Sequence, residues 1–561
     1  MQLALKVEKP ETITNVSVEE KATEENQLDA IIVEIGQFGR FQITNYLLLC
    51  LPIICRAFYS ISYVFTAGEV SYRCNITQCD GLDTGYDEPF LNFTTPLRHG
   101  AWDQCEHFAV ISDLEGTTPC NASSFNVSHQ VPCDAGFKML GDEQTIASEF
   151  GIFCADQWKL SMVGTVNNIG QFVGMPLGGY MADRYGRKFM LVVSGALSAF
   201  AGLARSNAPE YYSFLSLEFV DMVVGSTLYQ TAFLMAVELV GPKHRVVAAT
   251  GISLTFGLAD ALLGYLANYL RNWRFLLRAL YVPALLHLTF ICLLPESVRW
   301  LLSQEKELDA KAALRRAARV NRRALDEEKL NALVRSNRRL VAQSSASRGH
   351  YSVRQIYQAL GGRTALCCFV WLTNSLIDLG LSLNSTHLRG NKFDNFSMTG
   401  LMQLPGILMA TTLMNWVGRR WALSSFQFSC VTILLAVAAT DEDYPLTSSI
   451  LFFLAKLTSS ASIMILYFFT SEMFPTSCRN SVLSLCTSIS FLGAMLAPQT
   501  ILLIDYFEYA PHLLFATLGF TCSGLSLLFP ETNNKVLPTT LAEARALGKC
   551  IPKEKDSKSS V

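Results

Sequence analysis

Twelve apolar runs of roughly 20 residues each restrict what this chain can fold into. A helix of that length crosses about 30 Å of hydrocarbon. Only 16% of the 561 residues are charged, whereas soluble globular chains carry about 25%. The sequence therefore predicts an all-α polytopic membrane protein. The predicted spans are 42–66, 159–181, 189–205, 211–234, 246–269, 275–295, 364–384, 398–416, 420–440, 447–470, 481–503 and 511–529.

Two long loops differ in charge, and the difference predicts the orientation in the membrane. Segment 303–350 holds twelve Lys or Arg against six acids, whereas segment 68–157 holds three against fourteen. Because positive loops resist translocation, the basic loop is expected in the cytoplasm, and twelve spans then place both termini there. The start of the chain, MQLALKVEKPETITN, has no early apolar core, so we expect no cleaved signal peptide.

Segment 68–157 carries two further features of an extracellular loop. It contains four sequons for N-glycosylation, which takes place only on the lumenal side: Asn75, Asn92, Asn121 and Asn126. It also contains or borders six cysteines, Cys74, Cys79, Cys105, Cys120, Cys133 and Cys154. In an oxidising compartment, six cysteines predict three disulfides, and fifteen pairings are possible. We expect a disulfide-rich, glycosylated loop outside the plasma membrane.

Three charged junctions recur in the same order along the chain and indicate an internal duplication. Residues 183–188 (DRYGRK) after the second span match 415–420 (NWVGRR) after the eighth. Glu238 and Arg245 are seven apart, as are Glu472 and Arg479. The motifs PES and PET follow the sixth and twelfth spans, and the offsets between copies are 232 to 235 residues. Two six-helix halves related by an axis along the membrane normal are a common transporter plan.

The acids and bases at these junctions can pair across neighbouring helix ends and form a cytoplasmic gate. Simple anchoring by positive charge would explain the arginines but not the repeated acids. The candidate gate residues are Asp183, Arg184, Arg187, Glu238, Arg245, Glu472 and Arg479. The predicted organisation is a cytoplasmic segment 1–41, a half at 42–302, a basic helical linker at 303–362, a second half at 363–530 and a cytoplasmic tail at 531–561.

Several of these motifs resemble known transporters. GYMADRYGRK (179–188) resembles the signature between the second and third helices of the major facilitator superfamily. TIASEFGIFCAD (145–156), ELVGPKHR (238–245) and SEMFPTSCRN (471–480) are similar to its organic ion transporter family, the organic cation, anion and carnitine carriers. The resemblance covers about 30–545. It implies the twelve-helix major facilitator fold, a carrier that is not an enzyme, and alternating access.

Five charged residues inside predicted spans are candidates for function, because intramembrane charge is costly. They are Arg56, Asp221, Asp260, Asp378 and Lys456. Four lie at a similar depth, and Asp378 lies somewhat nearer the outside. We expect Arg56 to pair with Asp221, and Lys456 with either Asp260 or Asp378. One acid is then left without a partner, which favours a cation or a zwitterion as substrate.

A candidate substrate site follows from the family resemblance. Trp371 and Asp378 are seven apart and share a helix face, and Asp378 stands where relatives usually carry Tyr. An aromatic surface with a carboxylate suits an ammonium group. Lys456 could bind an anion or neutralise Asp378, and ordinary helix packing is the alternative reading of the aromatic residues. The predicted substrate-binding residues are Tyr229, Trp371, Asn374, Asp378, Lys456 and Phe491, the last at the place where relatives carry the charge that separates cation from anion carriers.

These observations predict a polyspecific plasma-membrane transporter of small organic cations or zwitterions, such as biogenic amines or carnitine-like compounds. The alternatives are an organic anion carrier, which would use Lys456 and Arg56 as counter-charges, and a transport-inactive receptor or scaffold that binds through its extracellular loop. No GxxxxGK[ST] loop is present, so ATP-driven pumping is not expected. The expected partners are a small organic ion and the lipid bilayer, without nucleic acid, cofactor or metal, and the expected state is a monomer or weak homo-oligomer.

Overall fold

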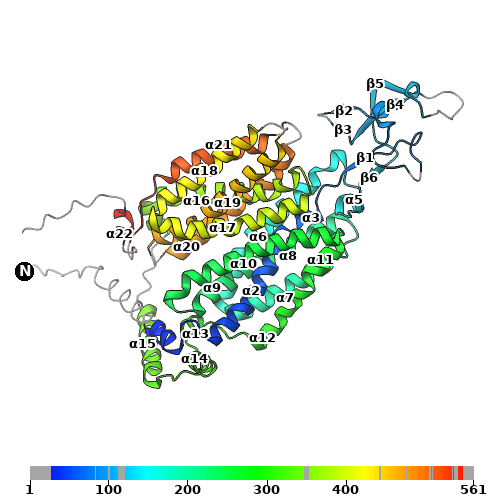
Figure 1. The fold of residues 1–561 in the computed structure, drawn as a ribbon. Coiled ribbons are helices and arrows are strands. Elements are labelled where there is room, and N and C mark those ends of the chain that lie inside the picture. The colour runs from blue at the N-terminus through cyan, green and yellow to red at the C-terminus, as the bar shows by residue number, and fades with distance from the viewer. Residues whose placement is uncertain are drawn as a thin grey trace, which may run out of the picture.

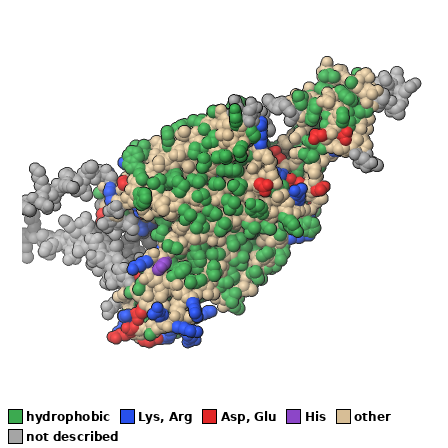
Figure 2. All heavy atoms as spheres, in the orientation of Figure 1, with side chains coloured by type: hydrophobic (Ala, Val, Ile, Leu, Met, Phe, Trp, Pro, Cys, Tyr) green, Lys and Arg blue, Asp and Glu red, His purple; other side chains and the backbone are tan. Residues whose placement is uncertain are grey.

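Two bundles of long helices lie side by side, and a small domain with short strands lies beyond one end of them (Figure 1). This computed structural model describes residues 27–81, 84–98, 101–111, 120–346, 353–440, 444–475, 478–503, 507, 509–533, 535, 538 and 541–547. On the face shown in Figure 2, hydrophobic side chains cover the helical body, and charged side chains gather towards its two ends. Such a surface fits a bilayer around the middle of the molecule.

The first bundle follows the predicted N-terminal half. Its helices are α2 (Arg40–Ile61), α3 (Tyr63–Thr66), α6 (Trp158–Tyr185), α7 (Arg187–Arg205), α8 (Tyr211–Gly225), α9 (Leu228–Leu239), α10 (Arg245–Leu270), α11 (Trp273–Tyr281), η4 (Pro283–Thr289) and α12 (Phe290–Leu293). The fourth predicted span is divided into α8 and α9, and the sixth into α11, η4 and α12.

The second bundle follows the predicted C-terminal half. It contains α16 (Val353–Asn384), η5 (Ser385–His387), α17 (Lys392–Trp416), α18 (Arg419–Ala438), α19 (Pro445–Met473), α20 (Arg479–Leu496), η6 (Ala497–Leu503) and α21 (Ala510–Ser526). The two bundles repeat the same packing. In the first, α8 packs against α6 and α7, and η4 packs against α7. In the second, α19 packs against α17 and α18, and α21 packs against α18.

Nine helices of the described chain are long and apolar enough to span a membrane by length and composition. The other three predicted spans correspond to α6, α17 and α21. Helix α21 has only 17 residues, and α6 carries the buried polar residues Asn167, Asn168 and Gln171. These amides lie inside the bundle, where they bond to other polar groups, so the low mean hydropathy of α6 reflects an interior polar face.

The halves meet along two pairs of helices, α6 with α20 and α10 with α17. Glycines permit the second approach: a Cβ at Gly264 would lie 2.8 Å from the Phe393 carbonyl oxygen, and one at Gly400 would lie 2.6 Å from the Ala261 nitrogen. Towards the extracellular end, the Gln499 amide donates to the Thr165 hydroxyl at 2.9 Å. These contacts hold the halves together in the outer part of the membrane region.

The extracellular domain is inserted between α3 and α6. Its elements are β1 (Tyr72–Cys74), α4 (Leu91–Thr94), β2 (Leu97–Arg98), β3 (Ala101–Trp102), β4 (Glu106–Val110), η1 (Ala122–Ser124), β5 (Phe125–Pro132), β6 (Phe137–Met139), α5 (Ile146–Phe150) and η2 (Cys154–Asp156). The strands form three antiparallel pairs, β1 with β6, β2 with β3 and β4 with β5. The buried hydrophobic cluster of this domain contains Cys74, Ile76, Phe108 and Phe125, and a core this small needs covalent support.

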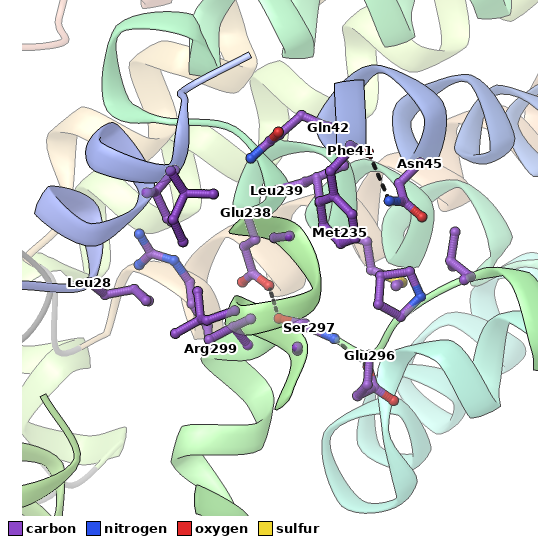
Figure 3. A pocket seen from close by; sticks show the side chains of 18 of the residues that line it. Leu28, Phe41, Gln42, Asn45, Met235, Glu238, Leu239, Glu296, Ser297 and Arg299 are labelled. Atoms are coloured by element: carbon purple, nitrogen blue, oxygen red, sulfur yellow. Dashed lines mark hydrogen bonds between the residues drawn. The ribbon is translucent and has the colours of Figure 1, made fainter. Parts of the chain in front are cut away.

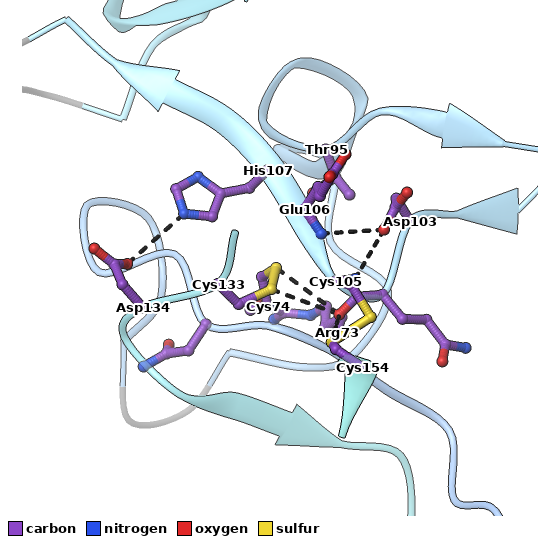
Figure 4. The surroundings of a disulfide bond; sticks show 12 residues. Arg73, Cys74, Thr95, Asp103, Cys105, Glu106, His107, Cys133, Asp134 and Cys154 are labelled. Atoms are coloured by element: carbon purple, nitrogen blue, oxygen red, sulfur yellow. Dashed lines mark hydrogen bonds and ion pairs between the residues drawn. A yellow bond between two sulfur atoms is a disulfide. The ribbon is translucent and has the colours of Figure 1, made fainter. Parts of the chain in front are cut away.

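Three disulfides supply that support, as predicted, and the structure resolves their pairing. Cys74 bonds to Cys133, Cys79 to Cys120, and Cys105 to Cys154. The first and third lie close together beside β4 (Figure 4). The third joins the domain to the start of α6, so it fixes the domain to the membrane part.

A buried ion pair adds to the disulfides. Arg73 donates to both carboxylate oxygens of Asp80 at 2.7 Å. Burial raises the pKa of the Asp80 carboxyl, but hydrogen bonds from Arg73, Ile76, Thr84 and Lys138 outweigh it and hold that pKa well below its usual range. Of the four predicted glycosylation sites, Asn92, Asn121 and Asn126 are exposed, and Asn75 is half-buried.

Short helices cover the end of the N-terminal half that lies away from the strand-containing domain (Figure 1). They are the helical residues 27–35, η3 (Pro242–His244), α13 (Val298–Ser303), α14 (Glu307–Asn321) and α15 (Glu327–Ala346). The Asp29 carboxylate accepts from Arg245 at 2.6 Å and from Arg299 at 2.9 Å. The short helix α22 (Leu541–Ala546) lies at the inner end of the C-terminal half, where Arg363 donates to the Ala544 carbonyl.

Candidate functional site

The junction between α6 and α7 in the N-terminal half is a compact cluster of charges. Gly186 turns the chain between α6 and α7 with φ +113°, a conformation that favours glycine. Arg187, one residue later, forms an ion pair with Glu238 at the end of α9. Glu238 also accepts from the Ser297 hydroxyl at 2.6 Å. The Glu296 carboxylate accepts from the backbone N–H of Lys188 at 3.1 Å, so it caps the start of α7.

The C-terminal half repeats this cluster contact for contact. Gly418 has φ +97°, and Arg419 pairs with Glu472 at 3.1 Å. The Thr532 hydroxyl donates to Glu472 at 2.6 Å, as Ser297 does to Glu238. The Glu531 carboxylate accepts from the Arg420 N–H at 3.1 Å, as Glu296 does from Lys188. The junctions matched by sequence thus have the same geometry.

The remaining predicted gate residues lie around these clusters and not within them. The Asp183 side chain is exposed and makes no ion pair with any described residue; its backbone carbonyl accepts from Trp300 Nε1 at 2.8 Å. Arg184 is also exposed and donates to the Tyr180 hydroxyl. Arg245 pairs with Asp29 of the helical residues 27–35. Arg479 at the start of α20 bonds to the Phe474 carbonyl oxygen at 3.5 Å.

A pocket opens beside the N-terminal junction, between residues 27–35, α2, α9, α13 and α14. Figure 3 shows Glu238, Ser297 and Arg299 on one side of it and Phe41 and Met235 on another. Most of its lining is apolar, and its charged residues already take part in the junction and in the contacts to Asp29. The pocket therefore belongs to the short helices that cover this end of the N-terminal half.

The prediction that Arg56 forms an ion pair with Asp221 is wrong. One oxygen of Asp221 accepts from the Ser198 hydroxyl and the other from the Tyr281 hydroxyl. Its nearest guanidinium is Arg205, at 3.6 Å, which also forms an ion pair with Glu218. Arg205, Glu218 and Asp221 are all fully buried.

Arg56 is held by an amide instead of a carboxylate. Its Nη2 donates to Gln171 Oε1 at 2.5 Å. Gln171 in turn donates to Asn167, and Asn167 donates to Glu218 at 2.7 Å. Arg56 therefore stands at the end of a buried polar chain that begins at the Arg205–Glu218 pair, and Asp221 acts on it only as a nearby charge.

Arg205 and Glu218 were missed by the sequence reasoning. Glu218 lies inside the predicted span 211–234, so a search of that span for every charged residue would have found it. Arg205 ends the predicted span 189–205, which suggests a membrane-surface position. In the structure, its side chain is fully buried between the rings of Phe214 and Tyr281.

Lys456 pairs with Asp378, one of the two partners expected for it. Lys456 Nζ lies 2.9 Å from Asp378 Oδ1 and also donates to the Ser382 hydroxyl at 2.8 Å. The hydroxyls of Ser459 and Ser460 donate to the same carboxylate oxygen at 3.1 and 3.3 Å. The Lys456 side chain is buried, whereas that of Asp378 is 23% exposed. This base and this acid neutralise each other.

Asp260 lies between the two halves. Its Oδ2 accepts from the Gln403 amide of α17 at 2.9 Å. Its Oδ1 is buried and has no hydrogen-bond partner among the described residues, and no Lys or Arg of the described chain lies within ion-pair distance. Arg56, Lys456 and Asp378 are near enough to act on it electrostatically.

The predicted aromatic residues fall into two groups. Tyr229 packs edge-on against Phe256 of α10, with ring centroids 5.5 Å apart. Trp371 lies in the C-terminal half, where its Nε1 donates to Thr470 at 3.0 Å and its ring meets Tyr467. Asn374 is buried and donates to the Val370 carbonyl, and Phe491 is half-buried on α20. The predicted site residues thus come from both halves.

The duplicated bundles, the paired junctions and the buried charges define a membrane transporter with the major facilitator fold. The family model described as sugar (and other) transporter matches residues 117–535, and the chain belongs to this family. The fold is similar to that of a crystallised double-Trp mutant of XylE, with a TM-score of 0.58 and 16% identity over 91% of this chain and 100% of the other. The inward open xylose transporter XylE from E. coli gives a TM-score of 0.57 at 17% identity, over 72% of this chain and 94% of the other.

Curated relatives support the narrower resemblance to organic ion carriers. "Organic cation transporter 1" of Caenorhabditis elegans is 27% identical over 96% of this chain and 92% of its own length. "Solute carrier family 22 member 3" of Rattus norvegicus is 27% identical over 93% of this chain and 96% of its own. The human "organic cation/carnitine transporter 2" is 26% identical over 91% and 93%. The recognition of the family and fold from sequence is confirmed.

Proposed function

We propose that the protein is a polyspecific plasma-membrane carrier of small organic cations or zwitterions that works by alternating access. The observation that carries this proposal is the balance of charge inside the spans. Four acids, Glu218, Asp221, Asp260 and Asp378, stand against three bases, Arg56, Arg205 and Lys456, in the buried network and the Lys456 pair. Arg274 and Arg278 near the start of α11 are left out of this balance, because they bond to Glu149 and to Asn207 outside the spans. Intramembrane charge is expensive unless it is compensated, so a surplus acid favours a substrate that brings a positive group.

The same balance weighs against an anion carrier. Lys456 is neutralised by Asp378 at 2.9 Å. Arg56 donates to Gln171 and lies near Asp221 and Asp260. An anionic substrate could accept from the buried Arg56 Nη1, which has no hydrogen-bond partner among the described residues, but it would add negative charge to a region that already carries an excess of acids. The names of the relatives, organic cation and organic cation/carnitine transporters, agree with the cationic alternative.

Repeated junctions at both cytoplasmic helix ends fit alternating access. Each Arg–Glu pair ties three helix ends within one half, so each half can move as a body while the contacts between halves change. The predicted substrate-binding residues remain Tyr229, Trp371, Asn374, Asp378, Lys456 and Phe491, which α9, α16, α19 and α20 contribute. Cytoplasmic termini and a monomeric or weakly oligomeric state stay part of the proposal.

Uptake into cells tests the function directly. Cells expressing the protein are given labelled tetraethylammonium, carnitine and p-aminohippurate, with uptake normalised to surface-biotinylated protein. We expect uptake of the cation or the zwitterion and none of the anion. Uptake of p-aminohippurate alone would overturn the proposal in favour of an anion carrier, and no uptake of any compound by protein at the cell surface would favour a transport-inactive receptor.

A further inference from the structure

We infer that Asp260 is the carboxylate that receives the positive group of the substrate, an inference that rests on the proposed function. Six charged side chains inside the described spans are buried: Arg56, Arg205, Glu218, Asp221, Asp260 and Lys456. Asp378, the seventh, is partly exposed. The contacts of these seven decide which acid is the surplus one.

Three of the four acids already have a base. Glu218 and Asp221 share Arg205, and Asp221 also has hydroxyl donors from Ser198 and Tyr281. Asp378 is bound by Lys456 and by two serine hydroxyls. None of these carboxylates can take a substrate cation without competing with a guanidinium or ammonium group of the chain.

Asp260 alone among them has a free acceptor and a neutral partner. It is 6% exposed, its Oδ2 is held by the Gln403 amide at 2.9 Å, and its buried Oδ1 has no described partner. Leaving a buried carboxylate oxygen unbonded is unfavourable, and an ammonium group would remove that penalty by supplying both a donor and the opposite charge.

Aromatic rings stand on the same side of α10 as this carboxylate. Phe256 is four residues before Asp260, so the two side chains share a helix face. The ring of Tyr229 meets Phe256 edge-on at 5.5 Å, and Phe233 stacks on Tyr229 at 5.9 Å. A carboxylate next to aromatic rings is suited to an alkylated ammonium group, because the faces of aromatic rings attract cations. The chemical class that fits is a small organic cation.

The position of Asp260 also connects binding with movement of the halves. Asp260 lies on α10 of the N-terminal half, and Gln403 lies on α17 of the C-terminal half. A cation on Oδ1 withdraws electron density from the carboxylate and weakens its bond to Gln403. The charge that selects the substrate thus lies at a contact that has to change when the halves rearrange.

Binding of labelled tetraethylammonium to the purified, detergent-solubilised protein tests this assignment. Asp260→Asn should weaken binding about tenfold or more, since tenfold corresponds to the loss of one modest charge interaction. Asp260→Glu keeps the charge and should recover part of the affinity. Asp394→Asn on the exposed first turn of α17 removes an equal charge away from the site and serves as the control.

The outcomes separate this inference from the proposed function. If the wild type binds tetraethylammonium and Asp260→Asn binds it equally well, the inference is overturned and the function stands. Unchanged affinity with slower uptake would also overturn it, because that result assigns Asp260 to the movement of the halves and not to binding. If the wild type neither binds nor transports cations, the proposed function fails first.

Discussion

The two halves of this transporter are alike at the charged junctions between their helix ends and different in the membrane interior. At the surface, Arg187–Glu238 and Arg419–Glu472 are matched together with their hydroxyl donors and capping carboxylates. In the interior, the N-terminal half holds a buried network around Arg205, whereas the C-terminal half holds a single partly exposed pair, Lys456–Asp378. Duplication has preserved the paired charges at the helix ends.

This difference in the interior distinguishes the acids that are paired with a base of the chain from the acid that is not. The N-terminal network has Arg56 and Arg205 against Glu218 and Asp221, so its formal charges cancel. Lys456 cancels Asp378 in the other half. The remaining acid, Asp260, lies where the two halves touch. The effects of substitutions in the two halves should therefore differ in size, according to how buried each charge is and which partners the substitution leaves unpaired.

The largest effect is expected from removing the buried guanidinium of the N-terminal network. Arg205→Met leaves Glu218 and Asp221 buried with only Arg56 nearby, and an uncompensated buried charge costs about 3–5 kcal/mol. Lys456→Met leaves Asp378 with two serine donors and some exposure, so it should cost clearly less. Thermal unfolding of both purified variants measures the difference. Equal destabilisation would mean that the two interiors are energetically alike.

The second effect concerns Arg56 and Asp221. The reciprocal exchange, Arg56→Asp with Asp221→Arg, would restore a direct pair if one existed. Because Asp221 is bound by Arg205, Ser198 and Tyr281, the exchange instead places two guanidinium groups together and should harm surface expression more than either neutral single variant. Surface biotinylation of the singles Arg56→Gln and Asp221→Asn beside the exchange tests this. Recovery by the exchange would contradict the contacts described above.

The third prediction concerns the two junction glycines, Gly186 and Gly418, where substitutions should reduce stability by similar amounts. Both have positive φ, and an added Cβ would lie 2.5 Å from Glu296 Oε2 at Gly186 and 2.7 Å from Glu531 Oε2 at Gly418. Gly186→Ala and Gly418→Ala should each cost about 1–3 kcal/mol through backbone strain. Gly179→Ala, with nothing within 4 Å of its Cβ, is the matched control. Detergent-phase melting curves should show similar losses for the first two and none for the control.

The smallest effects are expected at the half-buried junction charges, whose side chains are 13–20% exposed. Arg187→Gln and Arg419→Gln break partly exposed pairs worth about 1 kcal/mol or less. This free energy corresponds to at most about a fivefold change in an equilibrium constant. Each should slow transport without altering the substrate affinity, and by a similar factor. Asp183→Ala, which loses no ion pair to a described residue, should slow transport less. Initial uptake rates over a range of substrate concentrations separate turnover from affinity, and a change in substrate preference would contradict a role in gating alone.

Much of the fold could be predicted because its determinants are local or repeated. Span length follows from membrane thickness, and duplication follows from three junctions at nearly constant spacing. Three disulfides followed from six cysteines in one loop. The pairing of those cysteines did not, because it depends on which strands lie together: β1 and β6 bring Cys74 near Cys133 across 59 residues.

Depth along a helix was sufficient to suggest which charges could meet, but not which ones do. A one-dimensional count places Arg56 and Asp221 at one level and Arg205 at the membrane surface. It contains no information on the direction in which each side chain leaves its helix or on how far a long guanidinium reaches inward. The packing of α7 against α8 and η4 brings Arg205 to both Glu218 and Asp221. The sequence by itself indicated a surplus of one acid inside the spans. Only the tertiary structure added Arg205 and Glu218 to the buried charges and decided which acid is left without a base, because pairing depends on which helix faces touch.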